Sequence, residues 1–156
     1  MLIYPAIDIR NGKCVRLTQG TFSSEKVYFD KPHEVAKIWE DKGAKILHIV
    51  DLDGALGGEP KNLDVIKYII GNVNIPIQVG GGIRSMESIQ RLIDFGADRI
   101  ILGTKAIEDK GMVVKALGIY GEKIVIGIDA KDGYVAIDGW TNTSRIRAID
   151  FALEME

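Results

Sequence analysis

Two aspartates, Asp8 and Asp129, lie in similar segments far apart in the 156-residue sequence. Residues 7–12 (IDIRNG) align with residues 128–133 (IDAKDG) at a constant offset of 121, from position 8 to position 129. An aspartate after a strand commonly caps the next turn. A duplicated pair favours chemistry instead, because two carboxylates on opposite sides of one substrate can take up one proton and donate another. We therefore predict that Asp8 and Asp129 form a general acid–base pair.

Two glycine-containing segments are candidates for a phosphate site. Residues 80–85 (GGGIRS) follow an apolar run and open a helical pattern, and Gly103-Thr104 follows the next apolar run in the same way. A tight turn is the alternative interpretation of a glycine run. However, glycine lets the backbone approach an anion, and a helix N-terminus supplies unpaired amide donors. We predict one phosphate cradle shared by the two loops, formed by Gly81, Gly82, Arg84, Gly103 and Thr104.

Four other side chains could contribute to a site. Asp51, in the segment Val50-Asp51-Leu52-Asp53-Gly54, is predicted to orient the ligand or to bind a hydroxyl group or a metal. Trp140 could stack on a heterocycle or simply pack a loop. His48 lies within an apolar run and is predicted to be a hydrogen-bonded core histidine. Cys14 has no histidine or second cysteine nearby, so it is predicted to be a packing residue.

Short apolar runs alternate with amphipathic segments, which is typical of buried parallel strands connected by helices. The predicted strands are Leu2–Ile7, Lys45–Val50, Ile75–Val79, Arg99–Leu102 and Ile124–Ile128. The predicted helices are Pro32–Glu40, Asn62–Ile70, Ser85–Phe95, Gly111–Ile119 and Ser144–Met155. Short β-prone stretches, Cys14–Leu17 and Tyr134–Ile137, follow the two aspartate segments. Repeated β-then-α units of this kind predict a parallel sheet with right-handed crossovers.

The polar residues that end the five strands are spaced by roughly 30 residues, and eight such units would need about 240, close to the usual length of a (β/α)8 barrel. Open doubly wound sheets and closed barrels both bind ligands at this edge of the sheet. The internal repeat favours a duplicated half-barrel. We therefore predict an α/β fold of the TIM-barrel type in which residues 1–156 form a single domain of about five βα units, ending before the barrel closes.

The composition excludes several functional classes. A net charge of −2 and a pI of about 5.7 argue against a nucleic-acid or anionic-membrane surface. One cysteine and two histidines provide neither a disulfide framework nor an evident zinc site. The N-terminal apolar run is short and lacks a basic leader, which argues against a signal peptide or membrane span. We expect a cytoplasmic protein without a metal.

Five segments together resemble the ProFAR isomerase family of histidine biosynthesis, which acts on phosphoribosylformimino-5-aminoimidazole carboxamide ribotide. They are Pro5-Ala6-Ile7-Asp8, residues 50–55 (VDLDGA), residues 78–85 (QVGGGIRS), Leu102-Gly103-Thr104, and Gly127-Ile128-Asp129 followed by Asp138-Gly139-Trp140. The resemblance covers the whole chain in order.

This resemblance implies a (β/α)8 barrel of the ribulose-phosphate-binding type that uses neither cofactor nor metal. The implied reaction is an Amadori rearrangement of the biphosphorylated aminoaldose ProFAR to the aminoketose PRFAR. The position of Asp8 implies the proton acceptor and that of Asp129 the proton donor, with phosphate on Gly81, Gly82, Gly103 and Thr104. The family barrel continues through three further strands, which carry a threonine and a second phosphate site.

Two alternatives remain open. The cyclase subunit of imidazole glycerol phosphate synthase shares the barrel, the paired aspartates and a biphosphorylated ligand, although Ala6-Ile7-Asp8 and Val15-Arg16-Leu17 favour the isomerase. A non-catalytic phosphate-binding or assembly module is the other. The full-length family is expected to be monomeric, whereas five strands alone leave unpaired edges and an uncovered inner face. We expect the chain by itself to self-associate or to melt easily.

Overall fold

The structure of the chain is a computed structural model that describes residues 1–18, 21–137, 139 and 141–156. Its strands are β1 (Ala6–Arg10), β2 (Lys13–Thr18), β3 (Thr21–Phe29), β4 (Leu47–Asp51), β5 (Ile77–Gly80), β6 (Arg99–Leu102), β7 (Ile124–Ile126), β8 (Ala130–Lys131), β9 (Tyr134–Ile137) and β10 (Asn142–Arg147). Its helices are α1 (Pro32–Asp41), α2 (Leu52–Gly57), α3 (Leu63–Ile70), α4 (Met86–Asp94), α5 (Thr104–Glu108), α6 (Lys110–Tyr120), α7 (Ala148–Met155) and the 3-10 turn η1 (Gly121–Lys123).

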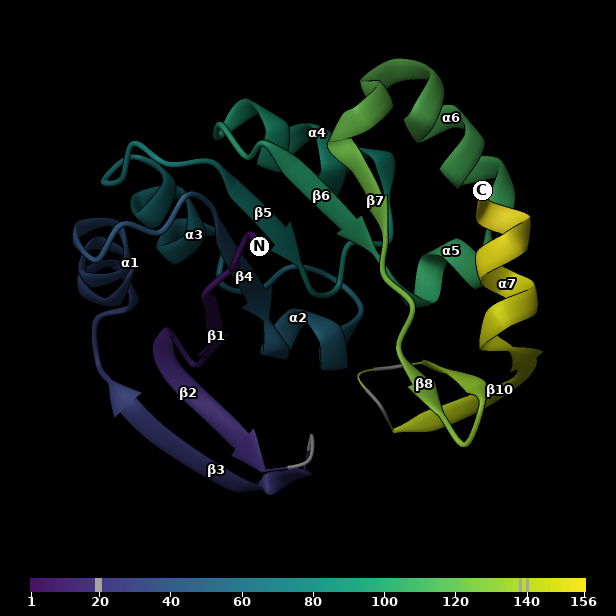
Figure 1. The fold of residues 1–156 in the computed structure, drawn as a ribbon, viewed down its shortest axis with the longest axis horizontal. Helices are drawn as coiled ribbons and strands as arrows, with labels where there is room; N and C mark the ends of the chain where they lie inside the picture. The colour runs from purple at the N-terminus through teal and green to yellow at the C-terminus, as the bar shows by residue number, and fades with distance from the viewer. Residues whose placement is uncertain (19–20, 138, 140) are drawn as a thin grey trace.

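Five adjacent parallel strands, from β1 to β7, make up most of a seven-stranded sheet with the order β3-β2-β1-β4-β5-β6-β7. They follow one another in chain order and curve in an arc, with α1, α3, α4 and α6 on the outer side (Figure 1). This open arc of alternating strands and helices is an α/β fold that corresponds to part of a (β/α)8 barrel, as the alternation of apolar runs and helical segments predicted.

Successive side chains of each parallel strand point to opposite faces of the sheet, and this determines which of them pack against the helices. Leu47 and Ile49 of β4 are fully buried in the core beneath the outer helices, whereas His48 and Val50 are only half-buried. The same pattern holds on β5, where Ile77 and Val79 are buried. The core therefore lies between the sheet and the helices, and the alternate positions face the concave side.

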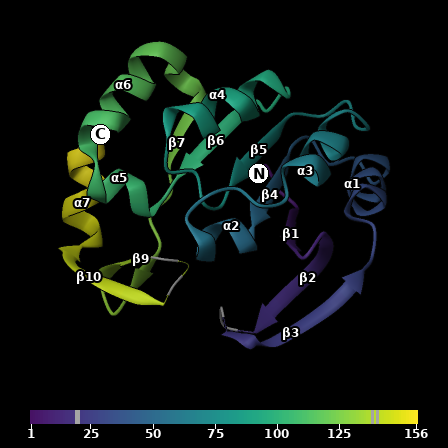
Figure 2. The same ribbon diagram turned by 180° about the vertical axis from the view of Figure 1, so that it is seen from behind.

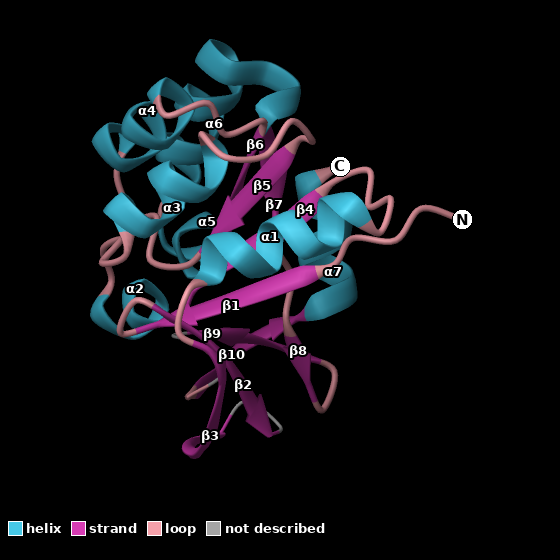
Figure 3. Cartoon of the chain, turned by 90° about the vertical axis from the view of Figure 1, so that its left-hand side faces the viewer, coloured by secondary structure: helices cyan, strands magenta, loops and turns pink. Residues whose placement is uncertain are grey.

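Two antiparallel ribbons project from the same end of the molecule. The β2–β3 hairpin continues from β1, and the small sheet β10-β9-β8 follows β7. Figure 3 shows both ribbons at the end where the parallel strands finish, and the view from behind in Figure 2 places α2 between them. The two ribbons therefore extend the edge of the sheet that carries the predicted site.

Two element predictions were wrong in their extent. The first strand begins at Ala6 rather than Leu2 and continues to Arg10, because its end pairs with β2. The last helix begins at Ala148 rather than Ser144, because residues 142–147 pair with β9 as β10. The short helices α2 and α5 and the strand β3 were not predicted at all.

Candidate functional site

A cavity of about 850 Å³ opens on the concave side of the sheet at the carboxyl ends of the parallel strands. The predicted residues that line it are Asp8, Gly81, Gly82, Arg84, Gly103, Thr104 and Asp129. Seven residues from strand β1 and from the segments after β5, β6 and β7 are thus brought to one space, as expected of strand ends that meet at the same edge. Trp140 lies outside the residues that the structure describes.

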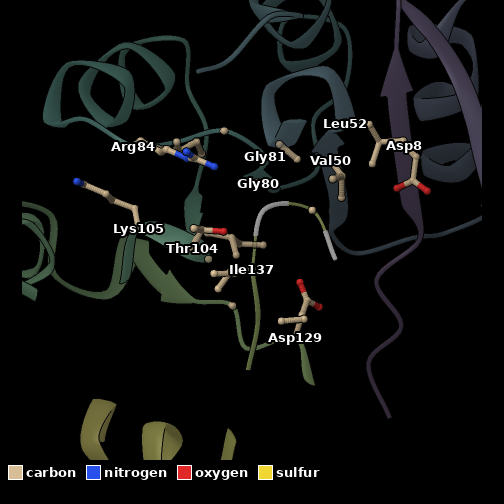
Figure 4. Close-up of a pocket in the computed structure, with 18 of the residues that line it drawn as sticks. Asp8, Val50, Leu52, Gly80, Gly81, Arg84, Thr104, Lys105, Asp129 and Ile137 are labelled. Atoms are coloured by element: carbon tan, nitrogen blue, oxygen red, sulfur yellow. The ribbon is translucent and has the colours of Figure 1, made fainter. Parts of the chain in front are cut away.

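The two aspartates approach the cavity from different sides. Asp8 lies within β1, and Asp129 lies in the connection between β7 and β8. Figure 4 shows both carboxylates directed into the space between them, with Arg84, Thr104 and Lys105 together in another part of the cavity. The arrangement can therefore hold an anionic group in one part of a ligand and transfer protons in another.

The electrostatic environment of Asp8 suits a proton acceptor. The Asp8 side chain is half-buried, and this burial raises its pKa above the usual 3.8. The nearby His48 and Arg16 act in the opposite direction and lower the pKa. A raised pKa makes the carboxylate a stronger base than an ordinary aspartate when it is ionised.

The glycine loop after β5 lies in close contact with the backbone of the segment that follows β4. Gly81 and Gly82 have φ angles of 105° and 72°, in the region that side chains disfavour. A Cβ atom on Gly81 would overlap the carbonyl oxygen of Asp51, and one on Gly82 would overlap the carbonyl oxygen of Gly54. Glycine is thus required at both positions for the loop to lie where it does.

Ser85 begins α4 directly after this loop. Its hydroxyl group accepts a hydrogen bond from the backbone N–H of Ser88 at 3.1 Å, so it acts as the N-cap of the helix. The N-terminus of α4 is therefore fixed beside the glycine loop. At the neighbouring loop, Gly103 is the residue before α5, and Thr104 is the first residue of that short helix.

Asp51 does not line the cavity, and its side chain is fully buried. One carboxylate oxygen accepts hydrogen bonds from the Gly54 N–H at 2.9 Å and the Asn62 amide at 2.7 Å. The other accepts from the backbone N–H groups of Lys61 at 2.7 Å and Asn62 at 2.9 Å. All four bonds are internal. The predicted contact between Asp51 and a ligand is therefore not supported, because the carboxylate is occupied in holding the loop beneath Gly81.

Asn62 extends this buried network to the first hairpin. Its amide nitrogen also donates to Asp53 at 2.9 Å, and its amide oxygen accepts from the N–H of Gly12 at 2.9 Å. Asp53 in turn accepts from the N–H of Asn11 at 2.6 Å. The turn that follows Asp8 and the loop that carries Gly81 are thus fixed to one set of polar side chains. No cluster of three or more potential metal-ligating side chains occurs in residues 1–18, 21–137, 139 and 141–156.

Three residues with polar side chains line the cavity but were not predicted to do so: His48, Gln78 and Lys105. His48 was predicted to be a hydrogen-bonded core histidine. The hydrogen bond is present, to Gln78, but the core position was wrong, because the side chain faces the cavity rather than the helices. The signal that could have revealed His48 and Gln78 is their polarity at alternate positions of two apolar strands. Lys105 follows Thr104 directly, and its amino group lies 3.3 Å from the Asp109 carboxylate.

The sequence of the chain is similar to that of a known protein family. The sequence profile described as "Histidine biosynthesis protein" matches residues 2–156. The chain belongs to this family. Similar members of the histidine biosynthesis family include proteins of Alkaliphilus metalliredigens (54% identical), Clostridium botulinum strain Langeland (56%) and Pelotomaculum thermopropionicum (53%). Each is named as the imidazole-4-carboxamide isomerase, ProFAR isomerase.

Each of these matches includes the whole of this chain. The chain spans 66%, 64% and 60%, respectively, of the lengths of those family members. The chain thus spans less than two thirds of the length of each of these relatives. No helix in the described part of the chain has the length and apolar character needed to cross a membrane.

Proposed function

We propose that the protein is an aldose–ketose isomerase of histidine biosynthesis that converts ProFAR to PRFAR. The observation that carries the proposal is the placement of Asp8 and Asp129 on different sides of one cavity that also contains both glycine-bearing loops. Relatives that are 53–56% identical over the whole chain are named for this reaction. The substrate is a small biphosphorylated ribonucleotide, and the chemistry is that of a cytoplasmic biosynthetic enzyme.

The acid–base pair has two proton transfers to perform. Protonation of the ribose ring oxygen opens the furanose to a Schiff base, and removal of the proton at C2 then gives an enolamine that collapses to the ketone. The protonated imine itself accepts the electron pair, so the protein needs only to deliver and remove protons. We assign the acceptor role to Asp8, whose pKa is raised by burial, and the donor role to Asp129.

Gly81, Gly82, Gly103 and Thr104 are proposed to bind one phosphate group, with Arg84 as its counter-charge. Positive φ angles at the two glycines turn the loop sharply just before the capped N-terminus of α4, whose amide groups favour an anion. We also propose that Trp140 stacks on the imidazole ring of the substrate.

Turnover of purified ProFAR, followed by the appearance of PRFAR, tests the proposal. The purified protein is assayed with ProFAR alone, and then with PRFAR as the substrate together with ammonia or a glutaminase subunit. PRFAR formation under the first condition is the expected result. Consumption of PRFAR only when ammonia is supplied would identify the cyclase instead, and phosphate binding without either reaction would identify a non-catalytic module.

A further inference from the structure

His48 is a titratable side chain of the cavity that the proton-transfer scheme does not use. It lies on β4, where its neighbours Leu47 and Ile49 are fully buried against the helices. Its cross-strand partner on β1 is Ala6, two residues before Asp8, and its partner on β5 is Gln78. Since Asp8 itself pairs with Val50, His48 lies two residues before the position opposite Asp8. Its imidazole is on the wall of the cavity, beneath the strand ends.

Gln78 determines which nitrogen of His48 carries the proton. The Gln78 amide nitrogen lies 3.0 Å from Nδ1 of His48. With the amide in this orientation its nitrogen donates to Nδ1, which places the proton of the neutral imidazole on Nε2. This hydrogen bond joins two side chains on adjacent parallel strands, where backbone pairing holds their separation. The pair therefore presents one N–H donor of fixed identity.

Burial, and not the charges around the ring, favours the neutral form of His48. Asp8 from β1 and Asp129 from the β7–β8 connection both favour a charged imidazole, whereas burial lowers the pKa of His48 and has the larger effect. A charged imidazolium between the two carboxylates would stabilise both as anions and weaken Asp8 as a base. A neutral imidazole does not hold Asp8 and Asp129 in the anionic form, so both carboxylates can gain and lose protons.

We propose that His48 is a substrate-binding residue that donates a hydrogen bond from Nε2 to a sugar oxygen held between Asp8 and Asp129, and that Gln78 is a positioning residue that fixes its tautomer. The sugar oxygen as recipient rests on the proposed function, whereas the tautomer does not. A sugar phosphate bound by the glycine loops would extend from its phosphate across the cavity wall that carries His48.

The tautomer is measured by nitrogen-15 NMR of protein labelled at histidine. The chain has only two histidines, and His33 on α1 serves as an internal reference because it packs edge-on against Tyr68, with ring centroids 4.8 Å apart. At neutral pH, His48 should carry its proton on Nε2. Gln78→Leu should produce a mixture of tautomers, whereas Gln90→Leu, on the exposed face of α4, should not. A proton on Nδ1, or mixed tautomers in the unaltered protein, would overturn the assignment.

Binding of ribose 5-phosphate tests the second half of the inference. We expect the ligand to shift the His48 Nε2 signal and not the His33 signals. His48→Phe should weaken ribose 5-phosphate binding by about tenfold and leave inorganic phosphate binding unchanged, as expected for loss of one hydrogen bond to the sugar. His48→Gln, which restores an N–H donor, should recover part of the loss.

Equal ribose 5-phosphate affinities of His48→Phe and the unaltered protein would overturn the binding role. Equal losses for ribose 5-phosphate and inorganic phosphate would also overturn it, because the substitution would then act on the phosphate loops. If the unaltered protein bound neither ligand, the proposed phosphate site would fail, and the sugar contact with it. The tautomer result would still stand as a separate measurement.

Discussion

Asp8 and Asp129 occupy the same register position in two hairpins of the same geometry. Asp8 pairs with Val15 across the β1–β2 hairpin, and the carbonyl oxygen of Asp129 accepts a hydrogen bond from the N–H of Ala136 at 2.7 Å. Both partners lie seven residues further along the chain, since 8 precedes 15 and 129 precedes 136. The matching turns, Asn11-Gly12 and Asp132-Gly133, have φ angles of 49° and 74° and of 52° and 84°. Matching hairpins therefore present the two carboxylates; a duplicated half-barrel stays a prediction.

Asp51→Asn should destabilise the protein strongly. The carboxylate accepts four hydrogen bonds from buried donors, and an amide would place an N–H group against at least one of them. We expect a loss of about 2–4 kcal/mol in the free energy of unfolding, measured by urea denaturation. The control, Asp64→Asn on the exposed face of α3, should change it by less than about 1 kcal/mol. Equal stability of Asp51→Asn and the unaltered protein would contradict the positioning role.

Gly82→Ala should displace the loop after β5. Its Cβ atom would overlap the Gly54 carbonyl oxygen, and the residue has a positive φ angle of 72°. We expect phosphate binding to be abolished and the protein to lose about 1–3 kcal/mol of stability. Gly118→Ala is the matched control, because it lies in α6 with no atom within 4 Å of the added Cβ. It should stabilise the protein by about 1 kcal/mol, and the two substitutions should differ in sign.

Lys105→Gln should weaken phosphate binding. The residue lines the cavity directly after Thr104, and its amino group is held 3.3 Å from the carboxylate of Asp109, which lies between α5 and α6. We expect a severalfold rise in the dissociation constant for phosphate, measured by calorimetry at low salt and smaller at high salt. Lys115→Gln on the exposed face of α6 provides the control. The same affinity in Lys105→Gln and Lys115→Gln would show that Lys105 does not contact the anion.

Asp8→Asn should make the protein more stable at neutral pH. Burial raises the pKa of Asp8 above 3.8, so the folded protein retains this proton at pH values where the unfolded chain has lost it. Ionisation of Asp8 therefore costs stability as the pH rises above about 4. The melting temperature of Asp8→Asn should exceed that of the unaltered protein by about a degree or more at pH 7, and the difference should vanish below pH 3.8. A lower melting temperature for the variant at pH 7 would contradict the claim that burial of the ionised Asp8 side chain costs stability.

The sequence predicted the elements whose signal is local. The apolar run around Leu47 and the helical spacing around Ile66 placed a strand and a helix close to where they lie. The end of β1 was misplaced because Asp8 interrupts an apolar run, and only pairing with β2 shows that the strand continues to Arg10.

Long-range pairing explains the errors at the site. The role of Asp51 depends on donors from Lys61 and Asn62, about ten residues away, and nothing in the local pattern reveals a fully bonded carboxylate. His48 was assigned to the core because its sequence neighbours are apolar. Only its pairing with Gln78 and the curvature of the sheet place it on the cavity wall. The glycine loop after β5 was found because the positive φ angles of Gly81 and Gly82 restrict residue type, which is a local requirement.

The acid–base roles of Asp8 and Asp129 are tested most directly by ProFAR turnover in Asp8→Asn, Asp129→Asn and the double variant. We predict that each single substitution lowers kcat by at least about a thousandfold, and that the double variant is little slower than either, since the two groups act on one reaction. Asp132→Asn is the control: it converts the second turn to the Asn-Gly sequence of the first and should retain full turnover. Turnover above about a tenth of the unaltered rate in either single variant would contradict the assignment.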